Sequence, residues 1–131
     1  LVSELGGKPT PVIGFGIGIE RLLGYLETKN IELKDDSSVD IYVASNTEDE
    51  NYVIRFVHSL RKKGFNVESD LLSRSLKSQF KYADKIGAKF VIVIGDDEIN
   101  ENKISIKNMQ TGEQIKIWSN DVAEYLSQNV K

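Results

Sequence analysis

Residues 89–94 read KFVIVI, a near-continuous apolar run. A strand of this kind is usually buried on both faces, as in a parallel sheet that is covered by helices. Two further short strands are indicated upstream, at residues 39–44 (VDIYVA) and 65–68. Between the three strands, residues 48–63 and 75–86 carry apolar side chains at helical spacing. The order β-α-β-α-β predicts three parallel strands joined by right-handed crossovers.

Both helices have recognisable boundaries. Thr47 and Glu50 have the spacing of a capping box at the start of the first helix, and Gly64 is typical of a C-terminal stop. The buried stripe of the first helix is predicted to be Val53, Phe56, Val57 and Leu60. The second helix is predicted to bury Leu76, Phe80 and Ala83.

The remainder of this region predicts a hairpin and a closing helix. Residues 103–107 and 114–118 alternate polar and apolar side chains around Thr111 and Gly112, which indicates two antiparallel strands. Residues 122–130 have a helical apolar pattern. The fold class is therefore α/β.

A polar stretch at residues 31–38, IELKDDSS, separates this region from the start of the chain. We therefore place one domain at residues 37–131 and a smaller region with its linker at residues 1–36. In the smaller region, residues 11–19 alternate small and bulky side chains, which predicts a strand. The apolar face that follows, at Ile19, Leu22, Leu23 and Leu26, predicts a helix.

Composition excludes several classes of protein. Of 131 residues, 40% are hydrophobic and 28% charged, which is typical of a globular protein. There is no cysteine and only one histidine, His58, so neither a disulfide framework nor a cysteine- or histidine-based metal site is expected. No apolar run is long enough to span a membrane, and no signal peptide is recognisable, so we expect a cytoplasmic location without membrane contact.

Charge is unevenly distributed, although the net charge is only −3. Residues 74–89 hold five basic side chains and one acid, whereas residues 96–101 hold four acids and no base. Lys77, Lys81 and Lys85 recur every four residues and so share one helix face. Such a face is either merely solvated or neutralised by a polyanion, and its one-sidedness favours RNA.

Three glycines at alternate positions, Gly14, Gly16 and Gly18, remove one row of side chains from the expected strand. Their spacing is not GxGxxG, so a dinucleotide-binding loop is only weakly indicated. The bare row suits tight packing, or a flat ligand such as a purine. Spacing alone favours packing.

The run GFGIGIERLL at residues 14–23 resembles motif 3 of the class II aminoacyl-tRNA synthetases, and its flank LVSELGGKPTPVIGF is similar to the histidyl-tRNA synthetases. This resemblance implies that Gly16 and Gly18 support the adenine of ATP and that Arg21 contacts the γ-phosphate. A guanidinium suits polyphosphate recognition. Without the motif, a surface ion pair would be the preferred interpretation of Arg21.

Two further runs, LSRSLKSQFKYAD at residues 72–84 and VIVIGDDE at residues 91–98, resemble the anticodon-binding domain shared by histidyl, prolyl, threonyl and glycyl enzymes. The histidyl version is the most similar. The resemblance implies a three-layer α/β/α domain. Its five-stranded mixed sheet would have the order 2-1-3-4-5, with strand 4 antiparallel to the rest and with three helices.

In open α/β sheets, ligands bind beyond the carboxyl ends of the parallel strands. The resemblance and the charge pattern together predict an anticodon-binding site of Ser73, Arg74, Lys77, Lys81, Glu98 and Lys107. Glu98 would repel phosphate, so within an RNA site it suggests hydrogen bonding to a guanine edge. Taken alone, an acid in this run is more typical of a solvated loop.

Aromatic side chains could stack on splayed bases. Most lie at core spacing, and we assign the set to packing: Tyr42, Tyr52, Phe65, Phe80, Tyr82, Phe90 and Trp118.

The resemblance implies a homodimeric parent enzyme that attaches histidine to tRNA(His) with ATP and Mg2+. Motifs 1 and 2 are missing from this sequence, so we expect it to be inactive alone and to need no cofactor. One alternative is a non-catalytic, anticodon-like RNA-binding module of a regulatory or accessory protein. Another is a flavodoxin-like nucleotide enzyme, although no glycine-rich phosphate loop follows the first strands.

Overall fold

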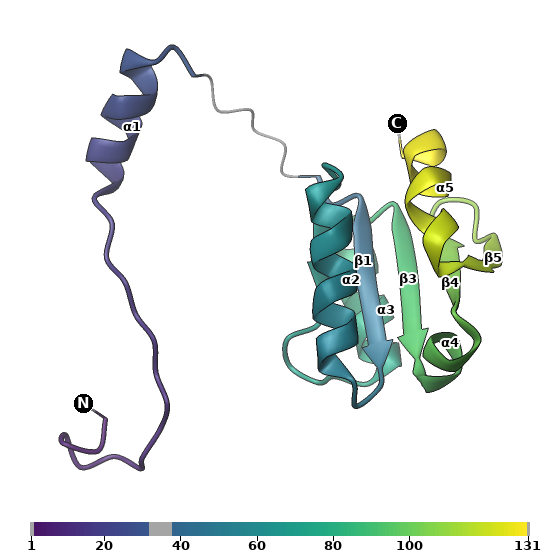
Figure 1. The fold of residues 1–131 in the computed structure, drawn as a ribbon, viewed down its shortest axis with the longest axis horizontal. Helices are drawn as coiled ribbons and strands as arrows, with labels where there is room; N and C mark the ends of the chain where they lie inside the picture. Colours follow the sequence, from purple (N-terminus) through teal and green to yellow (C-terminus); the bar gives the residue numbers. More distant parts are fainter. Residues whose placement is uncertain (1, 32–37, 131) are drawn as a thin grey trace. The chain divides into compact units, whose positions relative to one another are not determined.

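The computed structural model describes residues 2–31 and 38–130 and divides the chain into two compact units, Leu1–Asp36 and Ser37–Lys131. The larger unit is an α/β domain (Figure 1). Its elements are β1 (Ile41–Asn46), α2 (Glu50–Lys62), β2 (Val67–Ser69), α3 (Leu76–Lys85), β3 (Phe90–Gly95), α4 (Asp96–Glu101), β4 (Lys103–Asn108), β5 (Gln114–Trp118), the 3-10 turn Ser119–Asp121 and α5 (Val122–Asn129).

The five strands form one mixed sheet in the order β2-β1-β3-β4-β5. β1 lies in the middle of the parallel part, with Ile41 opposite both Val67 of β2 and Phe90 of β3. β4 runs antiparallel to β3 and to β5. This topology confirms the predicted strand order and the direction of strand 4.

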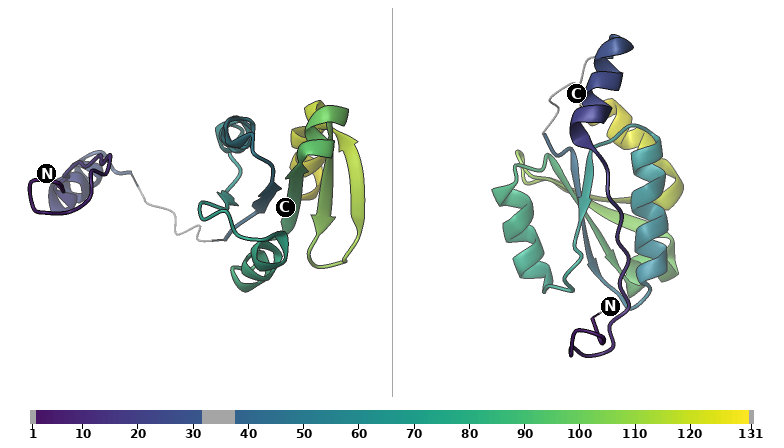
Figure 2. Two further views of the ribbon diagram at one scale, coloured as in Figure 1. Left: turned by 90° about the horizontal axis from the view of Figure 1, so that it is seen from below. Right: turned by 90° about the vertical axis from the view of Figure 1, so that its left-hand side faces the viewer.

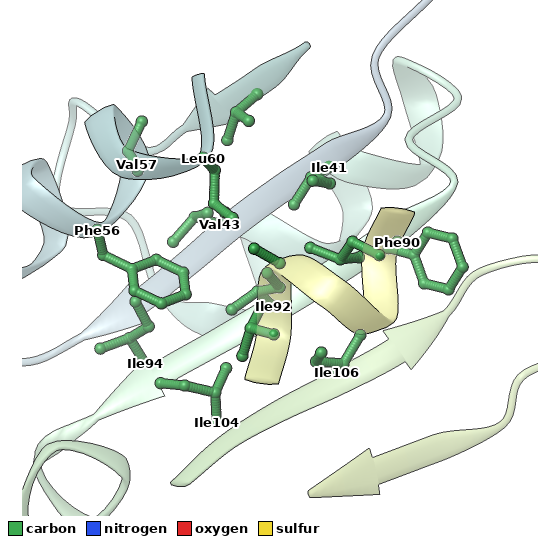
Figure 3. Packing of buried hydrophobic residues seen from close by; sticks show 14 of the residues in the cluster. Ile41, Val43, Phe56, Val57, Leu60, Phe90, Ile92, Ile94, Ile104 and Ile106 are labelled. Atoms are coloured by element: carbon green, nitrogen blue, oxygen red, sulfur yellow. The ribbon is translucent and has the colours of Figure 1, made fainter. Parts of the chain in front are cut away.

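Helices cover both faces of the sheet, with α2 and α5 on one side and α3 on the other (Figure 2, right). The larger core lies beneath α2 and α5, where Phe56 and Leu60 meet Val43 and Ile92 of the sheet (Figure 3). The predicted stripe of α2 is confirmed, since all four of its residues are buried. Beneath α3, a smaller core contains Tyr42, Ala44, Ala83, Ala88 and Val91, with Leu76 and Phe80 partly buried against it.

Several local predictions need correction. The helix α2 is capped by Asp49, whose side chain accepts from the Tyr52 amide at 2.9 Å, and not by Thr47. Its stop is confirmed, because Gly64 has the left-handed φ of 91° that glycine tolerates best. The strand β2 begins two residues later than predicted.

The acidic run after β3 forms the short helix α4. The prediction of three helices for this domain therefore missed one helix. Among the aromatic residues that were assigned to packing, the assignment is wrong for Trp118, which is 53% exposed, and Tyr82 is also exposed, at 36%.

The smaller unit contains one helix in its described residues, α1 (Ile19–Thr28). The helix was predicted, but the strand predicted at residues 11–19 does not form, and Ile19 begins the helix instead. A strand is held by hydrogen bonds to a neighbour, and no described residue pairs with this segment. The described part of the chain has no helix long and apolar enough to cross a membrane.

Candidate functional site

The loops that follow β1 and β2 meet at the carboxyl edge of the sheet, where they enclose a cavity of about 750 Å³ together with α2. Its polar lining includes Ser45, Asn46, Thr47, Asp70, Ser73, Arg74 and Asp96, and its α2 wall includes Val53, Ile54, Val57, His58 and Arg61. Thr47 donates to Asp96 at 2.6 Å, so the loop after β1 is also tied to the start of α4. The cavity therefore lies at the edge where the sheet topology predicts ligand binding.

Arg74 is held at this edge by Asp70. The Asp70 carboxylate accepts from the Arg74 amide at 2.7 Å and from Nε at 2.6 Å. Arg74 also lies 4.6 Å from the Tyr82 ring centroid and 3.5 Å from the Tyr42 hydroxyl. The loop is thereby fixed in a conformation in which Ser73, at the rim of the cavity, has a positive φ of 50°.

The same contacts change the acidity of the groups involved. Burial alone would raise the pKa of Asp70, but hydrogen bonds from the Arg74 backbone and side chain outweigh it, so the pKa is lowered. The hydrogen bond to Asp70 raises the pKa of Arg74. Burial raises the pKa of the Tyr42 hydroxyl. Asp70 and Arg74 are therefore held as a charged pair.

Gln79 joins β1 to the start of α3 and was missed by sequence reasoning. Its side chain is 1% exposed, accepts from the Ser45 amide at 2.9 Å, and donates to the carbonyls of Ser45 and Arg74 at 2.8 and 2.6 Å. A polar residue lying between Leu76 and Ala83 on the buried side of a helix was the available signal. Gln79 thus sets the position of one loop against the other.

The predicted basic residues of α3 are all accessible. Lys77, Lys81 and Lys85 are exposed on the side away from the sheet. Lys107, on β4, lies 5.6 Å from the Phe80 ring centroid and so adjoins α3. The structure therefore brings Lys107 to the flank of the helix that carries the other lysines.

Glu98 is neither a loop residue nor freely solvated. It lies on α4, where Oε2 accepts from the Gly95 amide and Oε1 from the Ser105 hydroxyl, both at 3.1 Å. Lys116 Nζ lies 3.9 Å from Oε1. The carboxylate is thus fixed in position, with its side chain only 16% exposed.

The residues predicted to contact ATP lie in the smaller unit. Arg21 is exposed on α1, Gly18 precedes that helix, and a Cβ added at Gly16 would meet open space. The described ranges contain no group of three acidic or histidine side chains that could hold a metal ion.

Comparison with known proteins identifies the larger unit. Residues 38–129 match the family described as anticodon binding domain. The chain is 49% identical over 118 residues to histidine–tRNA ligase of Acetivibrio thermocellus, covering 89% of the chain and 28% of that protein. It is 40% identical over 131 residues to the same enzyme of Geobacillus kaustophilus, covering 99% of the chain and 31% of that protein. The chain thus spans about a third or less of these relatives, in their C-terminal part.

Solved structures of histidyl-tRNA synthetases also resemble this chain. Apo histidyl-tRNA synthetase of S. aureus superposes with a TM-score of 0.65 at 41% identity, over 82% of this chain and 32% of that one. The Nostoc enzyme gives a TM-score of 0.66 at 32% identity, over 88% and 28%. The RNA binding domain of threonyl-tRNA synthetase from Cryptosporidium parvum, at 18% identity and a TM-score of 0.63 over 69% and 23%, shares the fold.

Proposed function

The chain belongs to the anticodon-binding domain family, in the form carried by histidine–tRNA ligases, and from this premise we propose that its larger unit recognises the anticodon of tRNA(His). One observation supports the proposal above the others. The domain carries exposed lysines on α3, and Glu98, which follows β3 at the carboxyl edge of the sheet, is fixed by two hydrogen bonds. Cations can hold the phosphates, while a fixed acceptor can select a base edge.

The residues of the proposed site have different roles. Lys77, Lys81 and Lys107 contact the RNA backbone, since an ammonium attracts phosphate from any sequence. Ser73, held at the rim by its strained loop, offers a hydroxyl to the RNA. Arg74 is already paired with Asp70, so its main task is to position that loop.

The activity of the whole enzyme needs more than this chain. In the parent protein, which we propose to be a homodimer, Arg21 contacts the γ-phosphate of ATP and the open glycine row supports adenine. Magnesium would assist histidine transfer in that protein. The cytoplasm, where tRNA is charged, is the proposed location.

The test is binding of the chain to a synthetic anticodon stem-loop of tRNA(His), measured by fluorescence anisotropy of labelled RNA over a range of salt concentrations. Changing Lys77 and Lys81 together to Gln should weaken binding several-fold. The slope of log affinity against log salt should become shallower by roughly 0.7 to 0.9 for each phosphate that the variant no longer neutralises.

A matched control removes the last lysine of α2, Lys62, and the C-cap Lys63 that follows it, on the opposite face of the sheet. Lys62→Gln with Lys63→Gln makes the same change of charge and should leave the slope almost unaltered. Equal slopes for the two double variants would mean that net charge alone attracts RNA. Absence of stem-loop binding by the unaltered chain would refute the proposed function itself.

A further inference from the structure

The half of the sheet formed by β4 and β5 has two unlike faces. On one face, isoleucines of both strands join or border the larger core. The alternate residues face the side that carries α3, in the cross-strand pairs Lys103–Trp118, Ser105–Lys116 and Lys107–Gln114. The helix α3 packs mainly on β1, and the β4–β5 hairpin extends beyond it (Figure 2, left). This row of residues, which we call the hairpin face, is polar except for Trp118.

Trp118 is the only tryptophan of the chain and is 53% exposed. The ammonium of Lys103 lies 4.7 Å from its ring centroid. Since the cation lies over one face of a half-exposed indole, the other face is the flat surface that a nucleobase can stack on, and the cation offers a charge for the adjoining phosphate. Because any base can stack on an aromatic ring, such a surface suits an unpaired nucleotide of any sequence.

The hairpin face continues the basic side of α3. At about 100° per residue, Lys77 lies about 60° and Lys81 about 100° around the helix from Phe80, on the side away from the buried Ala83. Since Phe80 lies beside Lys107, Lys77 lies on the side of α3 that is nearer the hairpin, and Lys81 lies on the outer side of the helix. Lys77 and the lysines of the hairpin therefore form one surface.

Acidic side chains neutralise the hairpin face only in part. Glu101 holds Lys116 at 2.9 Å, and Glu98 lies 3.9 Å from the same ammonium. In the described part of the chain, neither Lys103 nor Lys107 forms an ion pair with a carboxylate. Lys103, directly opposite Trp118, also lies close enough to Glu101 to help lower the pKa of that carboxyl. Lys107 lies four residues further along β4, so the two cations are available at separate points of the hairpin face.

We infer that Trp118 is a stacking platform for an unpaired nucleotide of the bound tRNA, with Lys103 contacting the adjoining phosphate and Lys107 contacting a phosphate further along the RNA. The inference rests on the proposed function, because it extends the RNA-binding surface from α3 across the hairpin face. It adds an aromatic, sequence-tolerant contact to the base reading proposed for Glu98.

Because Trp118 is the only tryptophan, its emission reports on this position alone. The chain is titrated with the anticodon stem-loop and, separately, with a fully paired duplex of the same stem, while RNA binding is followed independently by anisotropy. The stem-loop should quench the emission in parallel with binding. The duplex has no unpaired base, and it should leave the emission largely unchanged even where it binds.

Two substitutions separate stacking from apolar packing. Trp118→Leu should lower stem-loop affinity roughly 5- to 100-fold, the range of one base–aromatic stack, whereas Trp118→Phe keeps a ring and should lose much less. Both variants are compared by thermal unfolding, so that a folding defect is recognised. Lys103→Gln should weaken binding more than the α2 control Lys62→Gln.

The outcomes are distinct. Stem-loop binding without a change in Trp118 emission, or equal affinities of the Leu and Phe variants, would overturn the stacking platform and leave the proposed function standing. A blue shift of the emission that grows with protein concentration and needs no RNA would show that a second copy covers Trp118, and would also overturn it. Loss of all stem-loop binding would remove the proposed function and this inference together.

Discussion

The helices α1 and α2 have similar amphipathic sequences, yet only one of them buries its apolar face. In α2, Val53, Phe56, Val57 and Leu60 are buried against the sheet. In α1, no residue is buried, and Leu22 and Leu23 are 44% and 42% exposed. Helical periodicity therefore predicts that a helix forms, but it does not predict that a surface is available to receive it. The contribution of a leucine to the free energy of unfolding depends on whether such a surface buries it.

Substituting one leucine in each helix tests this comparison with the largest expected effect. Leu60 is 2% exposed, so Leu60→Ala should lower the free energy of unfolding by about 2 to 5 kcal/mol through reduced burial and a cavity. Leu23→Ala should change it by less than about 0.5 kcal/mol. Urea unfolding followed by circular dichroism measures both. A comparable decrease in the two variants would show that α1 has a partner surface in solution.

The same contrast explains how much the sequence could predict. The apolar run at residues 89–94 and the stripe of α2 determine the sheet and its covering helix, because the residues that bury them lie in the same unit. The strand expected at residues 11–19 needs hydrogen-bonding neighbours that the described residues do not supply. Local pattern is sufficient where its partners are present, and insufficient where they are not.

The site was predictable to a smaller degree. Exposed lysines on α3 follow from spacing alone. The hydrogen bond from Ser105 to Glu98 and the hydrogen bonds of Gln79 to Ser45 of β1 join different elements of the fold. Trp118 is exposed because no other segment of the described chain covers it fully. Such contacts are set by the final packing, so residue type and spacing do not reveal them.

One buried and one exposed carboxylate extend the comparison between the two units to charged side chains. The side chain of Asp70 is 2% exposed and hydrogen-bonded to Arg74, whereas Glu20 is exposed on α1. Asp70→Asn should cost about 1 to 3 kcal/mol at neutral pH, because it removes the charge that Arg74 faces. Glu20→Gln should cost almost nothing.

The effect of Asp70 also depends on pH in a defined direction. Its pKa in the folded protein is below the ordinary value of 3.8, so its stabilisation is complete above that value and is lost as pH falls through the lower folded pKa. The difference in unfolding free energy between the wild type and Asp70→Asn should therefore shrink on acidification. Urea titrations at several pH values below 5 measure it, and a difference that stays constant would contradict the role given to the pair.

The smallest expected effect on stability concerns Glu98, which has two separable duties. Its carboxylate accepts from the Gly95 amide and from the Ser105 hydroxyl, so it fixes the short helix α4 against β4. Glutamine can accept from that amide and still bond to a hydroxyl, and it should preserve α4 to within about 0.5 kcal/mol, whereas alanine should cost about 1 kcal/mol.

The preference of the Glu98 variants for the matched anticodon then shows which of these two roles serves recognition. If the charged carboxylate itself hydrogen-bonds a guanine edge, both Glu98→Gln and Glu98→Ala should lose discrimination between the matched stem-loop and one with a single guanine changed. The lost difference in binding free energy should be roughly 1 to 3 kcal/mol, by analogy with base-edge pairs in DNA. Lys107→Gln should instead weaken both RNAs alike. Binding of the variants at fixed salt decides the question. Retained discrimination in Glu98→Gln together with its loss in Glu98→Ala would make Glu98 a positioning residue for the carboxyl edge, and base reading would then pass to the loop that carries Ser73.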